Sequence, residues 1–223
     1  MATITPPKNL NYYFRKGHIL SDIGKIFSAS YYSNKAYYKD VLTQYINFST
    51  YINIFNSTAE FGSIHTDVEI QPNILGATTK DVVAIHGKPN LIFTEQKLTI
   101  YVYKWKFNGF KTRCEIHLYN NKAFLVNYIH NQLDTVDKGY IVKALTCKYS
   151  SQQNGLVDLF NNKIVDQNNN VVFINDYAQG FKVTYLSNIE SDWYEAMAAE
   201  VNAKKERQQA KVMSAEKSFL SKI

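Results

Sequence analysis

The sequence predicts an α+β protein: an antiparallel sheet meander packed by short helices, with an N-terminal helical region and a long C-terminal helix. Two observations support this class. A capped helical segment at 78–86 precedes several runs rich in β-branched and aromatic residues. After residue 187 the chain becomes rich in Ala, Glu, Lys and Gln, which favour helix. We therefore expect three regions: an N-terminal arm and helical region at 1–62, a sheet domain at 63–187 and a C-terminal helix at 188–223.

The helix at 78–86 has both a start and a stop signal. Thr78 is a good N-cap, and Asp81 lies three residues later, where its carboxylate can bond back to the cap. Gly87 can adopt the left-handed conformation that ends a helix, and Pro89 prevents continuation. Together, the start and stop signals predict a helix of about two and a half turns.

Three strands are expected to follow this helix. Residues 98–107 are rich in β-formers, and Asn108-Gly109 is the strongest short signal for a hairpin turn. The partner strand is 110–119, and a second polar turn leads to a third strand at 123–130. The resulting meander has one face that needs cover, and the helix at 78–86 is the nearest element that can supply it.

Further strands are expected on both sides of this unit. Residues 63–70 alternate and predict a strand. Runs at 140–149, 171–174 and 181–186 also read as strands, either as an extension of the same sheet or as a separate domain. Cys114 and Cys147 both fall in strand-like runs, and buried free thiols are expected rather than a zinc site or a redox pair. A disulfide between them would require the fold to bring them together.

The N-terminal region begins with an extended arm at 1–11, because Pro6 and Pro7 prevent a helix. A helix of about twenty residues is expected next, since apolar residues recur every three or four positions. That helix face consists of Tyr38, Leu42, Tyr45, Phe48, Ile52 and Phe55.

The C-terminal helix has an apolar stripe only over its first turns, at Trp193, Met197 and Val201. Acidic residues lie near its start and basic residues near its end, as the helix dipole favours. Beyond Lys204 it is mostly polar, so we expect it to project from the body or to dock on a partner.

Composition and motifs exclude several classes of function. The chain is 45% hydrophobic and 20% charged, as in globular proteins, and its net charge of +6 is modest. No apolar run approaches the roughly 18 residues of a membrane span. The N-terminus lacks a secretory signal pattern, so we expect a cytoplasmic protein or one in a particle assembled in the cytoplasm.

Chemistry-bearing patterns are sparse. No phosphate-binding loop, metal-ligand spacing or nucleophile motif is present, so we expect neither an enzyme nor a cofactor. His117 and Glu115 share a strand face that His130 could also join to form a pocket, but the pattern favours a polar pair on the sheet surface. Residues 166–170 begin like a calcium loop, but Val171 replaces the required glycine, which favours a hairpin turn.

The segment from Gly76 to Pro89, with Tyr103-Lys-Trp105 and residues 118–124, resembles the SmpA/OmlA (BamE-like) family and the related β-lactamase-inhibitor fold. The resemblance covers about residues 74–130. It implies a non-enzymatic protein that presents a sheet face to protein partners. This sequence departs from the outer-membrane members because it shows no lipid-attachment cysteine and no signal segment.

Two functions are predicted. The first is a non-enzymatic interaction protein or structural subunit of a larger assembly, such as a phage particle (virion) or an envelope-type complex. Its predicted partner-binding residues are Tyr103, Trp105, Phe107, Trp193, Met197, Lys204, Lys205 and Arg207. The alternative is binding of single-stranded nucleic acid, which needs stacking rings beside basic groups. Its predicted residues are Tyr12, Tyr13, Arg15, Lys16, Lys35, Tyr38 and Lys39.

Overall fold

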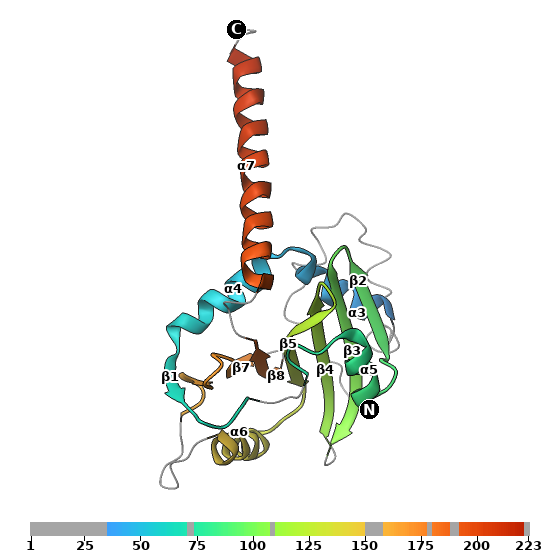
Figure 1. Cartoon of the computed structure of the whole chain (residues 1–223), viewed down its shortest axis with the longest axis vertical. Helices are drawn as coiled ribbons and strands as arrows, with labels where there is room; N and C mark the ends of the chain where they lie inside the picture. The colour runs from blue at the N-terminus through green and yellow to red at the C-terminus, as the bar shows by residue number, and fades with distance from the viewer. Residues whose placement is uncertain are drawn as a thin grey trace, which may run out of the picture. The chain divides into compact units, whose positions relative to one another are not determined.

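The computed structural model describes residues 35–70, 74–107, 110–149, 158–177, 180–187 and 192–220 (Figure 1). The chain divides into two compact units, residues 1–44 and residues 45–223. The expected extended arm at 1–11 lies outside the described residues.

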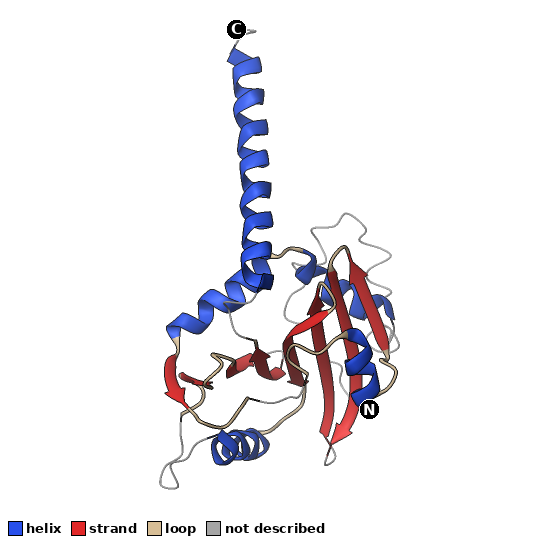
Figure 2. Ribbon diagram, in the orientation of Figure 1, coloured by secondary structure: helices blue, strands red, loops and turns tan. Residues whose placement is uncertain are grey.

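An eight-stranded sheet forms most of the second unit, and the protein is α+β as predicted (Figure 2). The strands lie in the order β1-β6-β7-β8-β5-β4-β3-β2, with β1 and β6 parallel and all other neighbours antiparallel. Their bounds are β1 Gly62–His65, β2 Leu91–Glu95, β3 Leu98–Phe107, β4 Phe110–Tyr119, β5 Lys122–His130, β6 Asn162–Val165, β7 Val171–Tyr177 and β8 Gly180–Leu186.

The predicted meander is confirmed in β3, β4 and β5. Asn120 and Asn121 both have positive φ, 47° and 68°, which is the twist that a two-residue hairpin turn requires. The Asn108-Gly109 turn lies outside the described residues. The sequence analysis missed β2, a short edge strand that follows Pro89 and pairs with β3. Strands β7 and β8 confirm the predicted runs at 171–174 and 181–186, and they extend the same sheet.

The prediction of a strand at 140–149 is wrong, because this segment belongs to the helix α6 (Thr135–Tyr149). The buried residues Val142, Leu145, Thr146 and Tyr149 follow the i, i+3, i+4, i+7 spacing of a helix face. Asp134 begins the helix, since its carboxylate accepts the backbone N–H of Asp137 at 2.8 Å. The β-branched and aromatic content of the run concealed this periodicity.

The single helix predicted for residues 38–55 is also wrong. The segment is divided into α3 (Lys35–Leu42), the 3₁₀ turn η2 (Thr43–Ile46), α4 (Ser49–Ser57) and the 3₁₀ turn η3 (Thr58–Glu60). Small polar side chains compete for the backbone where the helix breaks: the Thr43 hydroxyl donates to the Lys39 carbonyl, and Asn47 Oδ1 accepts the Ser49 N–H.

The strand predicted at 63–70 is realised only in β1, because the chain leaves the sheet after His65. Asp166 fixes the rest of this segment, since its carboxylate accepts the backbone N–H of Ile70 at 2.9 Å. The same carboxylate accepts the N–H groups of Asn168 and Asn170, which closes the predicted hairpin turn between β6 and β7.

The helix α5 (Thr79–His86) confirms the predicted start and stop. Thr78 and Asp81 form both bonds of a capping box. The Gly87 N–H donates to the Val83 carbonyl at 2.8 Å. Gly87 has φ 74° and ψ −166°, which differs from the expected left-handed helical conformation but is open essentially to glycine alone.

Helices cover both faces of the sheet. On one face, Val82 of α5 and Val142, Leu145 and Tyr149 of α6 join a core with Ile116 and other inward residues of the strands. On the opposite face, Tyr51 of α4 contacts His117 of β4. A β-bulge in β5 turns Phe124 toward this second face, where its ring lies 5.0 Å from Tyr51. The base of the last helix, α7 (Asp192–Leu220), packs here as well.

Candidate functional site

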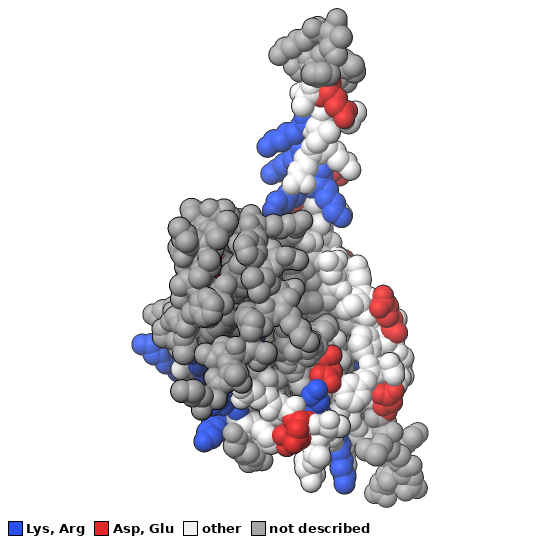
Figure 3. Space-filling model, turned by 180° about the vertical axis from the view of Figure 1, so that it is seen from behind, with Lys and Arg blue, Asp and Glu red and all other residues white. Residues whose placement is uncertain are grey.

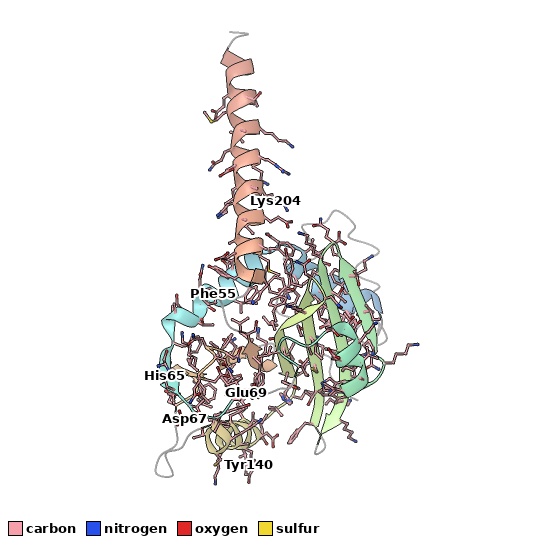
Figure 4. All side chains as sticks on the ribbon, viewed as in Figure 1. Phe55, His65, Asp67, Glu69, Tyr140 and Lys204 are labelled. Carbon is pink, nitrogen blue, oxygen red and sulfur yellow. The ribbon has the colours of Figure 1, made fainter. Side chains whose placement is uncertain are left out.

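The base of α7 is fixed to the sheet domain by aromatic contacts. The Trp193 ring lies 4.7 Å from that of Phe124, and its Nε1 donates to Ser187 Oγ at 3.0 Å. Tyr194 contacts Phe55 of α4 at 4.8 Å, and Figure 4 shows Phe55 beside the start of α7. Trp193 is 6% exposed and Met197 is fully buried, so these two predicted partner residues instead attach the helix to its own chain.

Beyond this base, α7 continues without packing partners in the described part of the chain. Every described side chain from Lys204 to Glu216 is exposed, and we call residues 204–216 the distal segment. The whole helix of 29 residues is about 44 Å long. Basic residues gather on the distal segment (Figure 3), where 204–211 contains four basic residues and one acidic one. Val212 and Met213 are 57% and 58% exposed.

One face of α7 changes from apolar to basic along its length. Met197, Lys204 and Lys211 are spaced by seven residues, so they lie on the same side of the helix, and Val212 adjoins them. Figure 4 places Lys204 beyond the body of the sheet domain. Lys204, Lys205 and Arg207 are thus exposed, as a partner-binding surface requires.

The predicted residues on β3 are not a continuous surface. Tyr103 is 2% exposed and donates from its hydroxyl to the Gly87 carbonyl at 3.1 Å; burial raises its pKa to about 12. Trp105 is half-buried, with its ring 5.1 Å from that of His86. The side chain of Phe107 lies outside the described residues.

The alternative nucleic-acid residues fall mostly outside the described residues, as Tyr12, Tyr13, Arg15 and Lys16 do. Lys35 begins α3, but its side chain is not described. Tyr38 is half-buried, with its ring 5.2 Å from that of Tyr37, and Lys39 is exposed.

A second concentration of polar groups lies inside the molecule, on the sheet face beneath α4. We call it the buried polar cluster; it consists of Tyr51, Arg113, Glu115, His117, Asn127, Lys182 and Thr184. Glu115 is 1% exposed, and His117 and Asn127 are completely buried. Register explains the grouping, because Asn127 lies opposite both Glu115 and Thr184 on neighbouring strands.

Charge contacts and hydrogen bonds connect the members. Arg113 Nε lies 3.0 Å from Glu115 Oε1, and His117 Nε2 lies 3.6 Å from Glu115 Oε2. Tyr51 Oη is 2.8 Å from His117 Nδ1, and the Thr184 hydroxyl donates to Asn127 Oδ1 at 2.9 Å. Among the described residues, neither Asn127 Nδ2 nor His117 Nε2 has a hydrogen-bond partner, although both atoms are buried.

In this cluster, burial and neighbouring charges have opposite effects on the pKa values of Glu115 and His117. Burial alone raises the pKa of Glu115, but His117, Arg113 and Lys182 outweigh it and hold that pKa below its usual value. Burial lowers the pKa of His117, and the Glu115 carboxylate compensates only in part. At neutral pH the cluster therefore holds a charged carboxylate beside a neutral imidazole.

The expectation that Glu115 and His117 share a strand face is confirmed, but the prediction that they form a surface pair is wrong, because α4 buries both, and His130 does not join them. His130 pairs with Thr112, which lies on the other face of β4, and its Nδ1 is 3.2 Å from the Thr112 hydroxyl. Sequence reasoning missed the remaining members of the cluster. The alternation of Arg113, Glu115 and His117 was the available signal, but the partners come from distant strands.

The other sequence features that were considered form neither a metal site nor a disulfide in the described residues. The described side chains include no group of three His, Cys, Asp or Glu that could hold a metal ion. Both cysteines are free; Cys114 is buried as expected, but Cys147 is exposed because it lies on α6 rather than on a strand. Among the described helices, none is long and apolar enough to cross a membrane.

Comparison with known proteins adds little to this geometry. No protein-family model and no curated protein matches the chain. Among solved structures, it is similar to a cysteine-rich secretory protein from Staphylococcus aureus, with 10% identity and a TM-score of 0.35. The alignment covers 58% of this chain and 51% of that one, so the chain spans about half the length of that protein. A similarity at this level identifies neither fold nor function.

Proposed function

We propose that this chain is a non-enzymatic interaction protein or structural subunit of a larger assembly, such as a virion or an envelope-type complex. It binds a protein partner through the distal segment of α7. The observation that carries the proposal is the exposure of every described side chain from Lys204 to Glu216 on a helix whose base is firmly packed. The earlier resemblance to the SmpA/OmlA family favours the same kind of function.

Stability considerations support a docking role for the distal segment. A polar helix without tertiary contacts is marginal in water, because packing of an apolar face supplies most helix stability. The rigid base at Trp193 and Met197 presents the distal segment in a defined direction, which lowers the entropic cost of binding.

The charge of the distal segment indicates the chemistry of the partner. Lys204 and Lys211 share one helix face, which the apolar Val212 borders, and Glu206 is the only acidic residue among positions 204–211. An acidic groove with an apolar floor would complement this face, in the way that amphipathic helices dock into grooves.

Co-purification from the native source tests the proposal with matched variants. We expect a chain ending at Ala203, and the pair Lys204→Glu with Lys211→Glu, to keep the fold and to lose the partner proteins. The control pair Ala210→Glu with Met213→Glu alters the opposite helix face and should retain them. Quantitative mass spectrometry of the bound proteins is the measurement, and circular dichroism verifies folding.

The same set of bound proteins on all four chains would contradict the proposal. Binding of a single-stranded oligonucleotide that falls steeply with salt, and that drops on Arg15→Ala or Lys39→Ala, would instead support the alternative function. The two functions are thus separated by which end of the chain the variants must alter.

A further inference from the structure

A path of polar contacts runs from helix α4 into the sheet through three residues, Tyr51, His117 and Glu115, which we call the latch. Tyr51 Oη lies 2.8 Å from His117 Nδ1, and His117 Nε2 lies 3.6 Å from Glu115 Oε2. None of the three side chains is more than 1% exposed. Water therefore does not compete for these contacts.

The donor and acceptor roles of the three side chains determine where the hydrogen atoms of the latch lie. The Glu115 carboxylate only accepts, so the proton of the neutral imidazole belongs on Nε2, which faces it. Nδ1 then accepts the Tyr51 O–H. A second proton, on Nδ1, would reverse this hydrogen bond: Nδ1–H would donate to Tyr51 Oη, and the Tyr51 O–H would lose its acceptor, because the described residues provide no other.

The groups around His117 come from several elements. Tyr45 lies 4.6 Å away ring to ring, Arg113 and Glu115 share its strand face, and Lys182 of β8 adds a positive charge. The residues directly opposite His117 on β3 and β5 are Ile100 and Leu125, which do not titrate. Among the described groups, a protonated imidazole would thus lie near two cations and one carboxylate, at a position that is completely buried.

The latch is in contact with the base of α7. The Tyr51 ring packs against Phe124 at 5.0 Å, and the other side of Phe124 contacts Trp193 at 4.7 Å. Phe55, one turn after Tyr51 on α4, contacts Tyr194 of α7 at 4.8 Å. Displacement of α4 therefore removes packing from the base of α7.

We infer that the latch is an acid-sensitive switch, in which protonation of His117 leaves the Tyr51 hydroxyl proton without an acceptor and releases α4 and the base of α7 from the sheet. An effect of this release on partner binding rests on the proposed function of α7. The switch itself is a property of the isolated chain.

Hydrogen exchange of the intact chain, followed by mass spectrometry at pH 7.5 and pH 5.5 and corrected for intrinsic rates, tests the inference. We expect protection of segments 49–57 and 192–201 to fall roughly tenfold at pH 5.5, the effect of one lost buried hydrogen bond. Strands β4 and β5 should keep their protection, because the sheet remains paired.

Two variants and a control complete the test. His117→Gln cannot take up the proton, so its two segments should respond less than threefold to pH. Tyr51→Phe folds without the hydroxyl, and it should show the loosened state at both pH values. His65→Gln, at an exposed position on β1, should respond as the unaltered chain does. Unchanged protection at pH 5.5, or a full response in Tyr51→Phe, would overturn the inference. Because no partner is present, failure here is distinct from failure of the proposed function.

Discussion

Glu115 is the residue on which the second face of the sheet depends. Its carboxylate is buried between Arg113, His117 and Lys182, and the attraction of these groups offsets the cost of removing a charge from water. Loss of the carboxylate would remove the negative charge that these three groups share. Residue-scale electrostatics therefore contributes to the stability of this face of the sheet.

Glu115→Ala should destabilise the chain by about 3 kcal/mol, the lower end for breaking a buried ion pair, because Arg113 keeps some access to water. Urea unfolding monitored by circular dichroism measures this cost. Glu95→Ala, which removes an exposed glutamate from β2, should cost no more than about 0.5 kcal/mol. Equal costs for the two variants would show that Glu115 is not held as described.

At the scale of single elements, α5 and α7 obtain their stability in opposite ways. Helix α5 is short, and its ends are fixed locally by the Thr78–Asp81 capping box and by Gly87. Helix α7 is long, and its described packing is confined to its base, through Trp193, Tyr194 and Met197. Local signals were enough to predict the first helix, whereas the second needs contacts that its own sequence does not supply.

Thr78→Ala should cost about 1 kcal/mol, because its side chain accepts the backbone N–H of Asp81 at the helix start. Thr78→Ser retains that acceptor and should stay within a few tenths of a kcal/mol of the unaltered chain. Denaturant midpoints of the three chains compare these values. A Ser variant as unstable as the Ala variant would mean that packing of the Thr methyl group, rather than capping, is responsible.

At the scale of the whole molecule, the described titratable groups that have lowered pKa values all act in the same direction below neutral pH. Each of them makes the folded chain less stable as the pH falls. The pKa values of His86, His117 and His130 are lowered by burial, and that of Glu115 is held low by its charged neighbours. For each group the unfolded chain binds protons more readily than the folded chain. Stability therefore rises with pH across the interval between the two pKa values.

The free energy of unfolding should be greatest near neutral pH, decline as pH falls below about 6.5, where unfolded histidines protonate, and decline further below about 4.5, where unfolded glutamates do. Urea unfolding at a series of pH values tests this expectation. His117→Gln should reduce the first decline and leave the second. A profile that is flat from pH 7 to pH 5 would contradict the burial of these histidines.

Interpretation of the sequence worked best where the relevant contacts are short in range. The capping box of α5, the Asn120-Asn121 turn and the strands β3, β4 and β5 all follow from neighbours along the chain. It failed at α6, where tertiary burial of Val142, Leu145 and Tyr149 prevails over strand-like composition.

Local patterns in the sequence were sufficient to predict the α+β class, the meander and the polar character of the distal segment of α7. The attachment of that helix to the body through Trp193 and Met197, and the burial of Glu115 and His117 under Tyr51, arise from contacts that appear only in the folded chain. The difference arises from how far apart in the sequence the contacting residues lie. Helix caps and turns depend on residues a few positions apart, whereas the contact between Tyr51 and His117 joins residues 66 positions apart.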